Sequence, residues 1–352
     1  MSLKLHRMQL PREVFLGNNT LELIGDICKK LGFSKSALIV TGSHTKKVAG
    51  QKVMDLLADR DMDVDYVIVT SSTAEDLRTV KDKIKELQPQ IVLGVGGGTK
   101  IDVAKLSSAN QNIPFISVPT TASHDGIASP LGAIKGLNKP FSVKAQAPMA
   151  IVADTQVIIH SPYRLIASGC GDTISKLTAV RDWRLAHDKN NEYYGGYADS
   201  LALMSAQLVM KNADVIQPKV EEGLRVLLEA LISCGVAMSI AGSSRPGSGS
   251  EHLFSHALDL ITPKHALHGE QCGVGTILMA HLHDINWKRI KEKLQRVGAP
   301  TTAKELGVKP EHVIEALVKA CTLRSERYTI LDEKKLDHDS AEKLAKATGV
   351  ID

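Results

Sequence analysis

Aromatic residues and clustered positive charge are scarce in this chain, and their scarcity excludes a class of partners. Phe, Trp and Tyr make up only 4% of the 352 residues, too few for surfaces that stack on nucleic-acid bases. The formal net charge is only +4, and no block of basic residues is interleaved with aromatics. We therefore expect no nucleic-acid partner.

Cysteines are few and scattered, and long apolar runs are missing. The five cysteines are odd in number and form no Cys-x-x-Cys pair, which favours reduced thiols over disulfides or a structural zinc site. The sequence shows neither an apolar run of evident transmembrane length nor a signal-peptide core. We expect a cytoplasmic protein without stable membrane insertion.

The first part of the chain alternates between short apolar runs and amphipathic stretches. This alternation is typical of a parallel sheet covered by helices on both faces. Strands are expected at 13–16, 37–40, 66–69, 91–95 and 114–118, with short strand-like pieces at 131–134, 141–143 and 150–152 and a hairpin turn at 136–138.

After Pro162 the pattern becomes almost wholly helical, and the change marks a domain boundary. The length suits two domains. We expect a Rossmann-like α/β domain over 1–160 and an all-α domain over 161–352. The expected helices cover 164–187, 198–212, 218–242, 250–261, 271–284, 287–297 and 310–324, with a last one inside 332–352.

Glycines follow the expected strand at 91–95 and precede a helical pattern. Because glycine has no Cβ, a ligand can approach residues 96–98, and the free N–H groups of the next helix favour an anion. Thr99 and Asp102 have the spacing of a capping box, which predicts that the helix begins there. Thr99 replaces the last glycine of G-x-G-x-x-G, so a tight turn without a ligand remains the alternative.

Polar residues in the helical half have the types that hold catalytic zinc. Asp172 follows Gly171, His252 and His256 share one helix face, and His268 lies further along. One carboxylate and two imidazoles are a common three-ligand set that leaves the fourth zinc position open. Singly, Asp172 could be a helix N-cap and the histidines ordinary surface or loop residues. Together they favour a metal site.

The stretch 119–130 gathers hydroxyls, an imidazole and a carboxylate at the carboxyl edge of the expected sheet. Such a loop would hydrogen-bond a cofactor and bring Asp125 near the reacting oxygen. The alternative is a loop that is merely polar and turn-forming.

Taken in order, these motifs resemble the superfamily of glycerol dehydrogenases, dehydroquinate synthases and iron-containing alcohol dehydrogenases. Within it, the archaeal sn-glycerol-1-phosphate dehydrogenases are the most similar. The resemblance covers essentially the whole chain, and its most specific parts are the runs at 121–130 and 249–256.

The resemblance implies NAD(P)H-dependent reduction of dihydroxyacetone phosphate to sn-glycerol 1-phosphate, the backbone of archaeal membrane phospholipids. It implies one zinc per subunit on Asp172, His252 and His268. Asp125 and His256 would be catalytic, and with Asp172 would face the substrate. The first domain would bind the dinucleotide and the second the metal and substrate, with the active site in the cleft between them. A homo-oligomer, dimer or octamer, is implied. The implied cofactor contacts are Gly96, Gly97, Gly98, Thr99, Lys100, Ile101, Asp102, Thr120, Thr121, Ala122, Ser123 and Ser129.

Departures from the superfamily pattern narrow the choice. Iron-dependent alcohol dehydrogenases place a histidine four residues after the acidic ligand, where this chain has Lys176, so zinc is favoured over iron. Dehydroquinate synthases use a glutamate at the position of Asp172. No acidic residue occurs at 41–43 to repel a 2′-phosphate, so both NAD and NADP are expected.

Two alternatives remain open at this point. A glycerol or other polyol dehydrogenase would lack phosphate recognition, for which Lys144, Arg245 and Lys264 are candidates. A non-catalytic nucleotide-binding protein is less well supported, because neither the glycine run nor a metal ligand has been lost.

Overall fold

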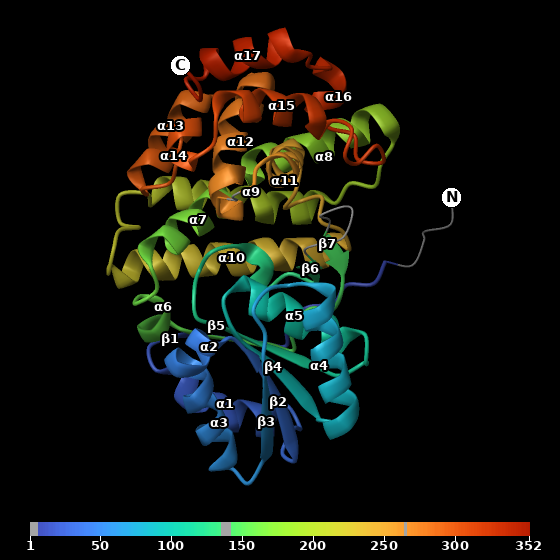
Figure 1. Ribbon diagram of the computed structural model, residues 1–352, viewed down its shortest axis with the longest axis vertical. Coiled ribbons are helices and arrows are strands. Elements are labelled where there is room, and N and C mark those ends of the chain that lie inside the picture. Colours follow the sequence, from blue (N-terminus) through green and yellow to red (C-terminus); the bar gives the residue numbers. More distant parts are fainter. Residues whose placement is uncertain (1–5, 135–141, 264–265) are drawn as a thin grey trace. The chain divides into compact units, whose positions relative to one another are not determined.

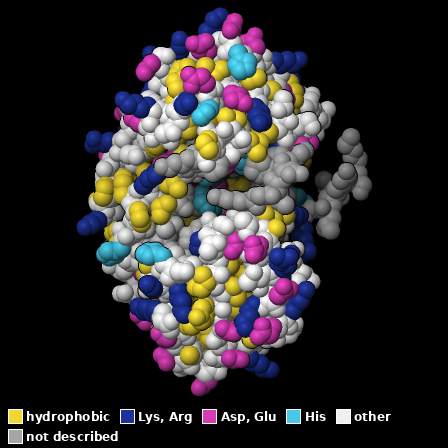
Figure 2. Space-filling model, viewed as in Figure 1, with side chains coloured by type: hydrophobic (Ala, Val, Ile, Leu, Met, Phe, Trp, Pro, Cys, Tyr) yellow, Lys and Arg dark blue, Asp and Glu magenta, His cyan; other side chains and the backbone are white. Residues whose placement is uncertain are grey.

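The computed structural model describes residues 6–134, 142–263 and 266–352, so the hairpin turn expected at 136–138 lies outside the described residues. The chain forms two compact units, Met1–Pro162 and Tyr163–Asp352. Dark-blue basic and magenta acidic side chains are interspersed over the visible face of each unit (Figure 2), in keeping with the small net charge.

The first unit is built on a six-stranded, wholly parallel sheet (Figure 1). The strand order is β1-β8-β5-β4-β2-β3. Leu93 in the central strand β4 lies opposite Ile39 of β2 and Ile116 of β5. The strands are β1 (Glu13–Gly17), β2 (Ser36–Thr41), β3 (Asp63–Ile68), β4 (Ile91–Gly96), β5 (Phe115–Pro119) and β8 (Ala150–Asp154).

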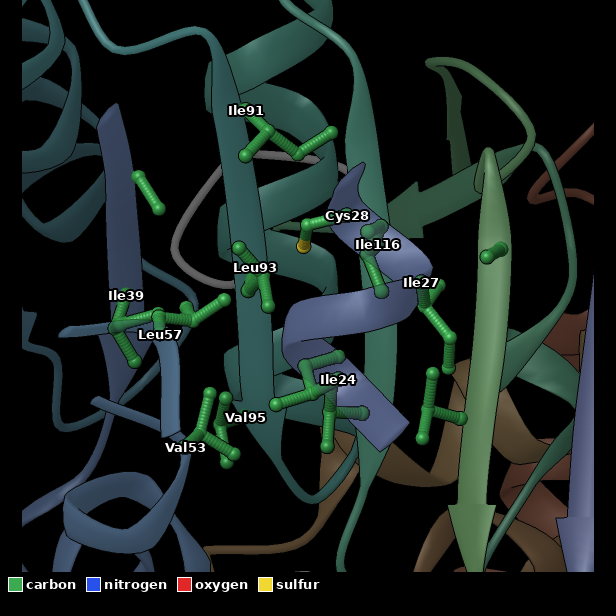
Figure 3. Close-up of a cluster of buried hydrophobic side chains, with 14 of the residues drawn as sticks. Ile24, Ile27, Cys28, Ile39, Val53, Leu57, Ile91, Leu93, Val95 and Ile116 are labelled. Atoms are coloured by element: carbon green, nitrogen blue, oxygen red, sulfur yellow. The ribbon is translucent and has the colours of Figure 1, made fainter. Parts of the chain in front are cut away.

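Helices cover both faces of this sheet because its strands are apolar on both sides. On one face Leu93 and Ile39 pack in a single cluster with Ile24 and Leu57 (Figure 3). Each such side chain contributes about 1.5–3 kcal/mol when buried. The helices are α1 (Ile24–Lys30) and α3 (Gln51–Ala58) on that face, and α4 (Ala74–Leu87) and α5 (Gly98–Ala109) on the other.

The strand order creates a switch point beside the glycines. From β2 the chain moves outward to β3, whereas from β4 it moves the other way to β5. Ligands of open α/β sheets bind outside the carboxyl ends of strands at such a point. Gly42 follows β2, and residues 96–98 end β4 and begin α5. The short pieces β6 (Leu131–Ala133) and β7 (Ser142–Lys144) pair antiparallel apart from the main sheet.

The second unit is helical throughout its described residues. The region expected as one helix over 164–187 is two helices that meet at Ser175, and the helix expected from 271 begins at His268. The elements are α7 (Tyr163–Ile174), α8 (Lys176–Asn190), α9 (Gly196–Lys211), α10 (Glu221–Ala241), α11 (Ser250–Ile261), α12 (His268–Leu282), α13 (Trp287–Arg296), α14 (Ala303–Leu306), α15 (Pro310–Ala320), α16 (Ile330–Lys334) and α17 (His338–Ala347).

Helix α10 is long and apolar enough to cross a membrane by length and composition alone. The expectation that no stretch has this character is therefore wrong for α10. In the structure 67% of its apolar window is buried, and the helix packs against α9 and α7. Length and apolar composition alone do not distinguish a buried core helix of this kind from a membrane-spanning helix.

Candidate functional site

The glycine turn positions the start of α5 at the switch point. The helix begins at Gly98 with Gly97 as its N-cap, so the capping box expected from Thr99 and Asp102 is wrong. No side chain in the described part of the chain caps this end. The first N–H groups of a helix have no acceptor within it, and with the helix dipole they favour an anion.

His124 explains why residue 98 must be a glycine. A Cβ on Gly98 would lie 1.7 Å from the His124 Nε2 atom, and one on Gly126 would lie 2.4 Å from the Cε1 atom of the same ring. The ring is held there because the Gly126 N–H donates to its Nδ1 atom over 2.9 Å. Behind the turn, a Cβ on Gly94 would approach that of Ala104 to 3.0 Å, so α5 rests directly on β4.

Two hydroxyls at the end of β5 fit a cofactor at this turn. The Oγ1 atoms of Thr120 and Thr121 are buried, yet neither has a hydrogen-bond partner within the described residues. A Cβ on Gly97 would come within 3.3 Å of the Thr121 hydroxyl. Because a buried polar atom without a partner is costly, a polar ligand beside Gly97 would satisfy the Thr121 hydroxyl. The glycine turn and these threonines therefore fit a dinucleotide.

Several other expected cofactor contacts face the protein instead. Lys105 is fully buried and donates to an Asp102 carboxylate oxygen over 3.2 Å and to the carbonyl oxygens of Gly126 and Leu131. The second Asp102 oxygen accepts the Ala133 N–H over 3.1 Å. Asp102 therefore anchors the loop after β5.

The remaining expected contacts divide between the interior and the edge of the sheet. Ile101 and Ala122 are fully buried, and the Ser129 hydroxyl donates to the Leu131 carbonyl oxygen over 3.1 Å. Lys100 stays at the carboxyl edge, where its ammonium donates to the Thr70 carbonyl oxygen over 3.1 Å. Asp125 begins the short 3-10 helix Asp125–Ile127. Ser123 is partly buried just before it.

In the second unit the structure brings together Asp172, His252 and His268, and adds Cys272. One ligand atom from each lies within 4.8 Å of the others. Asp172 is 1% exposed inside α7, which overturns its alternative as an N-cap. Sequence analysis missed Cys272, although it lies four residues after His268 and thus on the same face of α12.

Backbone contact between α7 and α12 brings the ligands together. A Cβ on Gly171 would lie 2.2 Å from the carbonyl oxygen of Gly269, and one on Gly269 would lie 1.9 Å from that of Ser168. Only glycine permits this approach. Asp172 and His268 are the immediate neighbours of these two glycines, so the close crossing sets their separation.

The hydrogen bonds of His252 orient it for metal binding. Its Nδ1 atom lies 2.8 Å from the Glu251 carboxylate, which leaves Nε2 to carry the lone pair, 3.7 Å from an Asp172 oxygen. Glu251 is fully buried and also accepts from the Thr178 hydroxyl and the Gly249 N–H, each over 2.7 Å. Burial raises the pKa of Glu251, and these two hydrogen bonds oppose that rise.

A relay of side chains orients His268. The Gln271 amide nitrogen donates to Asp259 over 3.0 Å, so its oxygen accepts the Ser255 hydroxyl over 2.6 Å. Because the Ser255 hydroxyl donates its hydrogen to Gln271, its oxygen acts as the acceptor toward His268. The His268 Nδ1–H therefore donates to it over 3.2 Å. The tautomer with its lone pair on His268 Nε2 follows from this relay.

Two further groups complete the cluster. Lys176 is fully buried and its ammonium lies 2.8 Å from an Asp172 oxygen. The His256 ring stacks on that of His268, with centroids 6.2 Å apart. Burial is the largest of the effects that lower the pKa of His256 well below its usual range, and the charges of His268 and His252 add to it. His256 is therefore neutral at neutral pH.

The number of protein ligands at the site depends on whether Cys272 binds the metal. Four protein ligands make a closed structural zinc site, whereas three leave a position for substrate. Burial raises the pKa of the Cys272 thiol well above its usual range, so the neutral thiol is its stable form in the protein alone. The two imidazoles and the carboxylate are the donors of a common open catalytic site.

Asp182, which sequence analysis also missed, holds the start of α11. This fully buried carboxylate accepts from the N–H and the hydroxyl of Ser250, each over 2.6 Å. It also accepts from the Ile330 N–H over 2.8 Å and lies 3.0 Å from His283 Nε2. Nothing in its local sequence distinguishes it, because these partners lie far along the chain.

Comparisons with known proteins show the family of the chain. A sequence profile of iron-containing alcohol dehydrogenases matches residues 15–162. The chain is 54% identical to glycerol-1-phosphate dehydrogenase (NAD(P)+) of Thermococcus kodakarensis over 351 residues, 100% of both chains. It is 52% identical to the protein of the same name from Methanosarcina barkeri over 344 residues, 98% of this chain and 96% of the relative.

A solved structure shows the same fold at low identity. The glycerol dehydrogenase of Schizosaccharomyces pombe superposes with a TM-score of 0.79 at 22% identity, covering 98% of this chain and 91% of that one. This likeness concerns the fold.

Proposed function

The chain belongs to the glycerol-1-phosphate dehydrogenase family of NAD(P)-dependent oxidoreductases, and we propose that it reduces dihydroxyacetone phosphate to sn-glycerol 1-phosphate with the help of one zinc ion per subunit. The observation that carries the proposal is the convergence of Asp172, His252 and His268 in a buried cluster. The cytoplasm as the site of reaction, a homo-oligomeric state, and the lack of nucleic-acid partners and membrane insertion are parts of the same proposal.

Zinc fits the donor set better than iron. Two neutral imidazoles and a carboxylate are common ligands of catalytic zinc. Lys176 stands where a further histidine would be expected in an iron site, and its ammonium contacts Asp172. When bound, zinc supplies a positive charge that stabilises negative charge developing on the substrate oxygen.

The chain's residues then position the reactants. When bound, the nicotinamide of NAD(P)H would supply the hydride for the carbonyl carbon, and the carbonyl oxygen would need a proton. We assign proton delivery to water or to His256, with Asp125 as an orienting group. A neutral His256 suits a relay, because it can donate from one ring nitrogen while it accepts on the other.

The cofactor would bind the first unit. We propose that the pyrophosphate lies at the start of α5 and that Thr120 and Thr121 donate to the cofactor. Their buried hydroxyls support this assignment. Residues 41–43 carry no acidic group to repel a 2′-phosphate, so NADP as well as NAD is accommodated.

Oxidation of NADH and NADPH by the purified protein tests the proposal. We expect turnover with dihydroxyacetone phosphate to exceed that with unphosphorylated dihydroxyacetone, and the product to be the sn-1 phosphate ester. A preference for the unphosphorylated ketone would instead make the protein a polyol dehydrogenase. Turnover with neither ketone on zinc-loaded protein would refute the reductase activity.

A further inference from the structure

The Asp182 carboxylate on α8 contacts both of the helices that carry the histidines of the candidate metal site. Its Oδ2 atom accepts the N–H and the hydroxyl of Ser250 in the first turn of α11, the helix of His252. Its Oδ1 atom lies 3.0 Å from the Nε2 atom of His283, the C-cap of α12, and that helix begins with His268. One buried carboxylate therefore links α11 to α12.

The start of α11 rests directly on α8 around this carboxylate. A Cβ on Gly249 would lie 2.5 Å from Asp182 Oδ2 and 2.8 Å from a backbone atom of α8, so only glycine fits there. One turn earlier on α8, the Thr178 hydroxyl donates to the Glu251 carboxylate over 2.7 Å. Thr178 and Asp182 share one face of α8 because they are four residues apart. Together they hold the two residues that directly precede His252.

Both oxygens of Asp182 are needed as acceptors. The carboxylate is fully buried, and while Oδ2 accepts from Ser250, Oδ1 accepts the Ile330 N–H over 2.8 Å. An asparagine offers one acceptor oxygen and one donor nitrogen, so in either orientation its NH2 group would face a backbone N–H. Because a buried donor without an acceptor is costly, the substitution would loosen these contacts.

Arg245 holds the segment that leads into α11 against the same surroundings. Its guanidinium donates to the Glu192 carboxylate, just after α8, and over 3.0 Å to the Tyr328 carbonyl oxygen, close to the start of α16. Arg245, which the sequence suggested for phosphate recognition, is thus engaged in this contact. Of the other two such candidates, Lys144 is exposed on β7 of the first unit and Lys264 lies outside the described residues.

We propose that Asp182 is a positioning residue of the metal site, a proposal that rests on the proposed function. Asp182 is not one of the four clustered ligand residues. It holds the first turn of α11 against α8 and against the end of α12, and thereby sets the separation of His252 and His268. Metal ligands must be held close to their productive geometry, so loosening this junction weakens zinc binding.

The Asp182→Asn variant tests this role through zinc affinity and does not depend on turnover. Measured by chelator competition, its zinc affinity should be about 10-fold below that of the wild type, the lower end of the range for residues that orient metal ligands. The visible ligand-field bands of the cobalt-substituted protein should shift as well, because they report how the ligands are arranged around the metal.

Asp199→Asn is the matched control. Asp199 is 1% exposed and accepts from the Arg184 guanidinium, but it lies on α9, which carries none of the clustered ligands. We expect Asp199→Asn to lower the unfolding free energy and to keep the wild-type zinc affinity and cobalt spectrum. Should Asp182→Asn fail to fold, Ser250→Ala removes one hydrogen bond to the same carboxylate and should bind zinc about 2–10-fold more weakly.

Zinc binding in the absence of substrate separates failure of the positioning role from failure of the proposed function. Weaker zinc binding by Asp182→Asn than by Asp199→Asn supports the role even if the wild type proves inactive on dihydroxyacetone phosphate. Wild-type zinc affinity in folded Asp182→Asn, or in Ser250→Ala if only that variant folds, would overturn the role, whatever the wild type reduces. A wild-type protein that binds no zinc would refute the metal site, and the positioning role with it.

Discussion

Gly171 and Gly269 contact each other through their backbones. Gly171 directly precedes the predicted metal ligand Asp172, and Gly269 directly follows His268. A Cβ on Gly171 would lie 2.2 Å from the Gly269 carbonyl oxygen. If α7 and α12 moved apart, Asp172 would separate from His268. The spacing of the ligands therefore depends on two residues that contribute no ligand atom.

Substitution of Gly269 should damage the metal site from outside it. A Cβ there would lie 1.9 Å from the Ser168 carbonyl oxygen, so Gly269→Ala must push α12 away from α7. We expect a loss of about 1–3 kcal/mol in unfolding free energy. Zinc affinity, measured by chelator competition, should fall too. Gly196→Ala, whose new Cβ would meet only a Tyr194 ring atom at 3.9 Å, is the control. Unchanged zinc affinity in Gly269→Ala would contradict this explanation.

The relay through Ser255 should strengthen zinc binding without touching the metal. Ser255→Ala removes the acceptor for His268 Nδ1, and Gln271→Leu frees the Ser255 hydroxyl to donate in the wrong direction. Each variant should bind zinc about 10–100-fold more weakly. The exposed Ser200→Ala provides a baseline, because its hydroxyl only contacts the Gly196 carbonyl oxygen. Wild-type affinity in both relay variants would show that the tautomer is set in another way.

Cobalt substitution should show whether Cys272 is a ligand. We expect the cobalt protein to lack a strong near-ultraviolet thiolate-to-cobalt band, since three protein ligands leave the position that a catalytic site needs. Cys272→Ser should then give the same spectrum and keep its activity. A strong band that disappears in Cys272→Ser would establish a closed four-ligand site and argue against catalysis at this metal.

The glycine turn offers a test in the first unit. In Gly98→Ala the new Cβ would overlap the His124 ring at 1.7 Å, so we expect weaker NADH binding and a lower melting temperature. Adding His124→Ala to this variant removes the obstacle and should restore most of the thermal stability. If the double variant is no more stable than Gly98→Ala alone, the His124 ring is not the reason for glycine at this position.

The local sequence pattern predicted the bounds of an element well where residues within and beside that element determine where it begins and ends. Helix α11 was expected at 250–261 and has those bounds, because its apolar period and its flanking residues agree. The break at Ser175 was missed because no glycine or proline marks it. The start of α5 was misplaced because Gly97 is its N-cap and no hydroxyl caps that end, so the spacing of Thr99 and Asp102 was misleading.

Residue types predicted three of the candidate metal ligands, but not Cys272 or the residues that hold those ligands in place. Cys272 went unnoticed because α12 was expected to start at 271, which left His268 outside the helix and hid their i,i+4 relation. Glu251 contacts Thr178, and Asp182 contacts Ser250, only because tertiary packing brings these distant residues together. Sequence periodicity carries no signal for such contacts.

Zinc titration into metal-free protein tests the central claim most directly. The account predicts that oxidation of NADH by dihydroxyacetone phosphate rises linearly and reaches its plateau at one zinc per chain. It also predicts that His252→Ala, folded by circular dichroism, neither binds this zinc nor turns over. Full turnover in metal-free protein, or in His252→Ala, would contradict it.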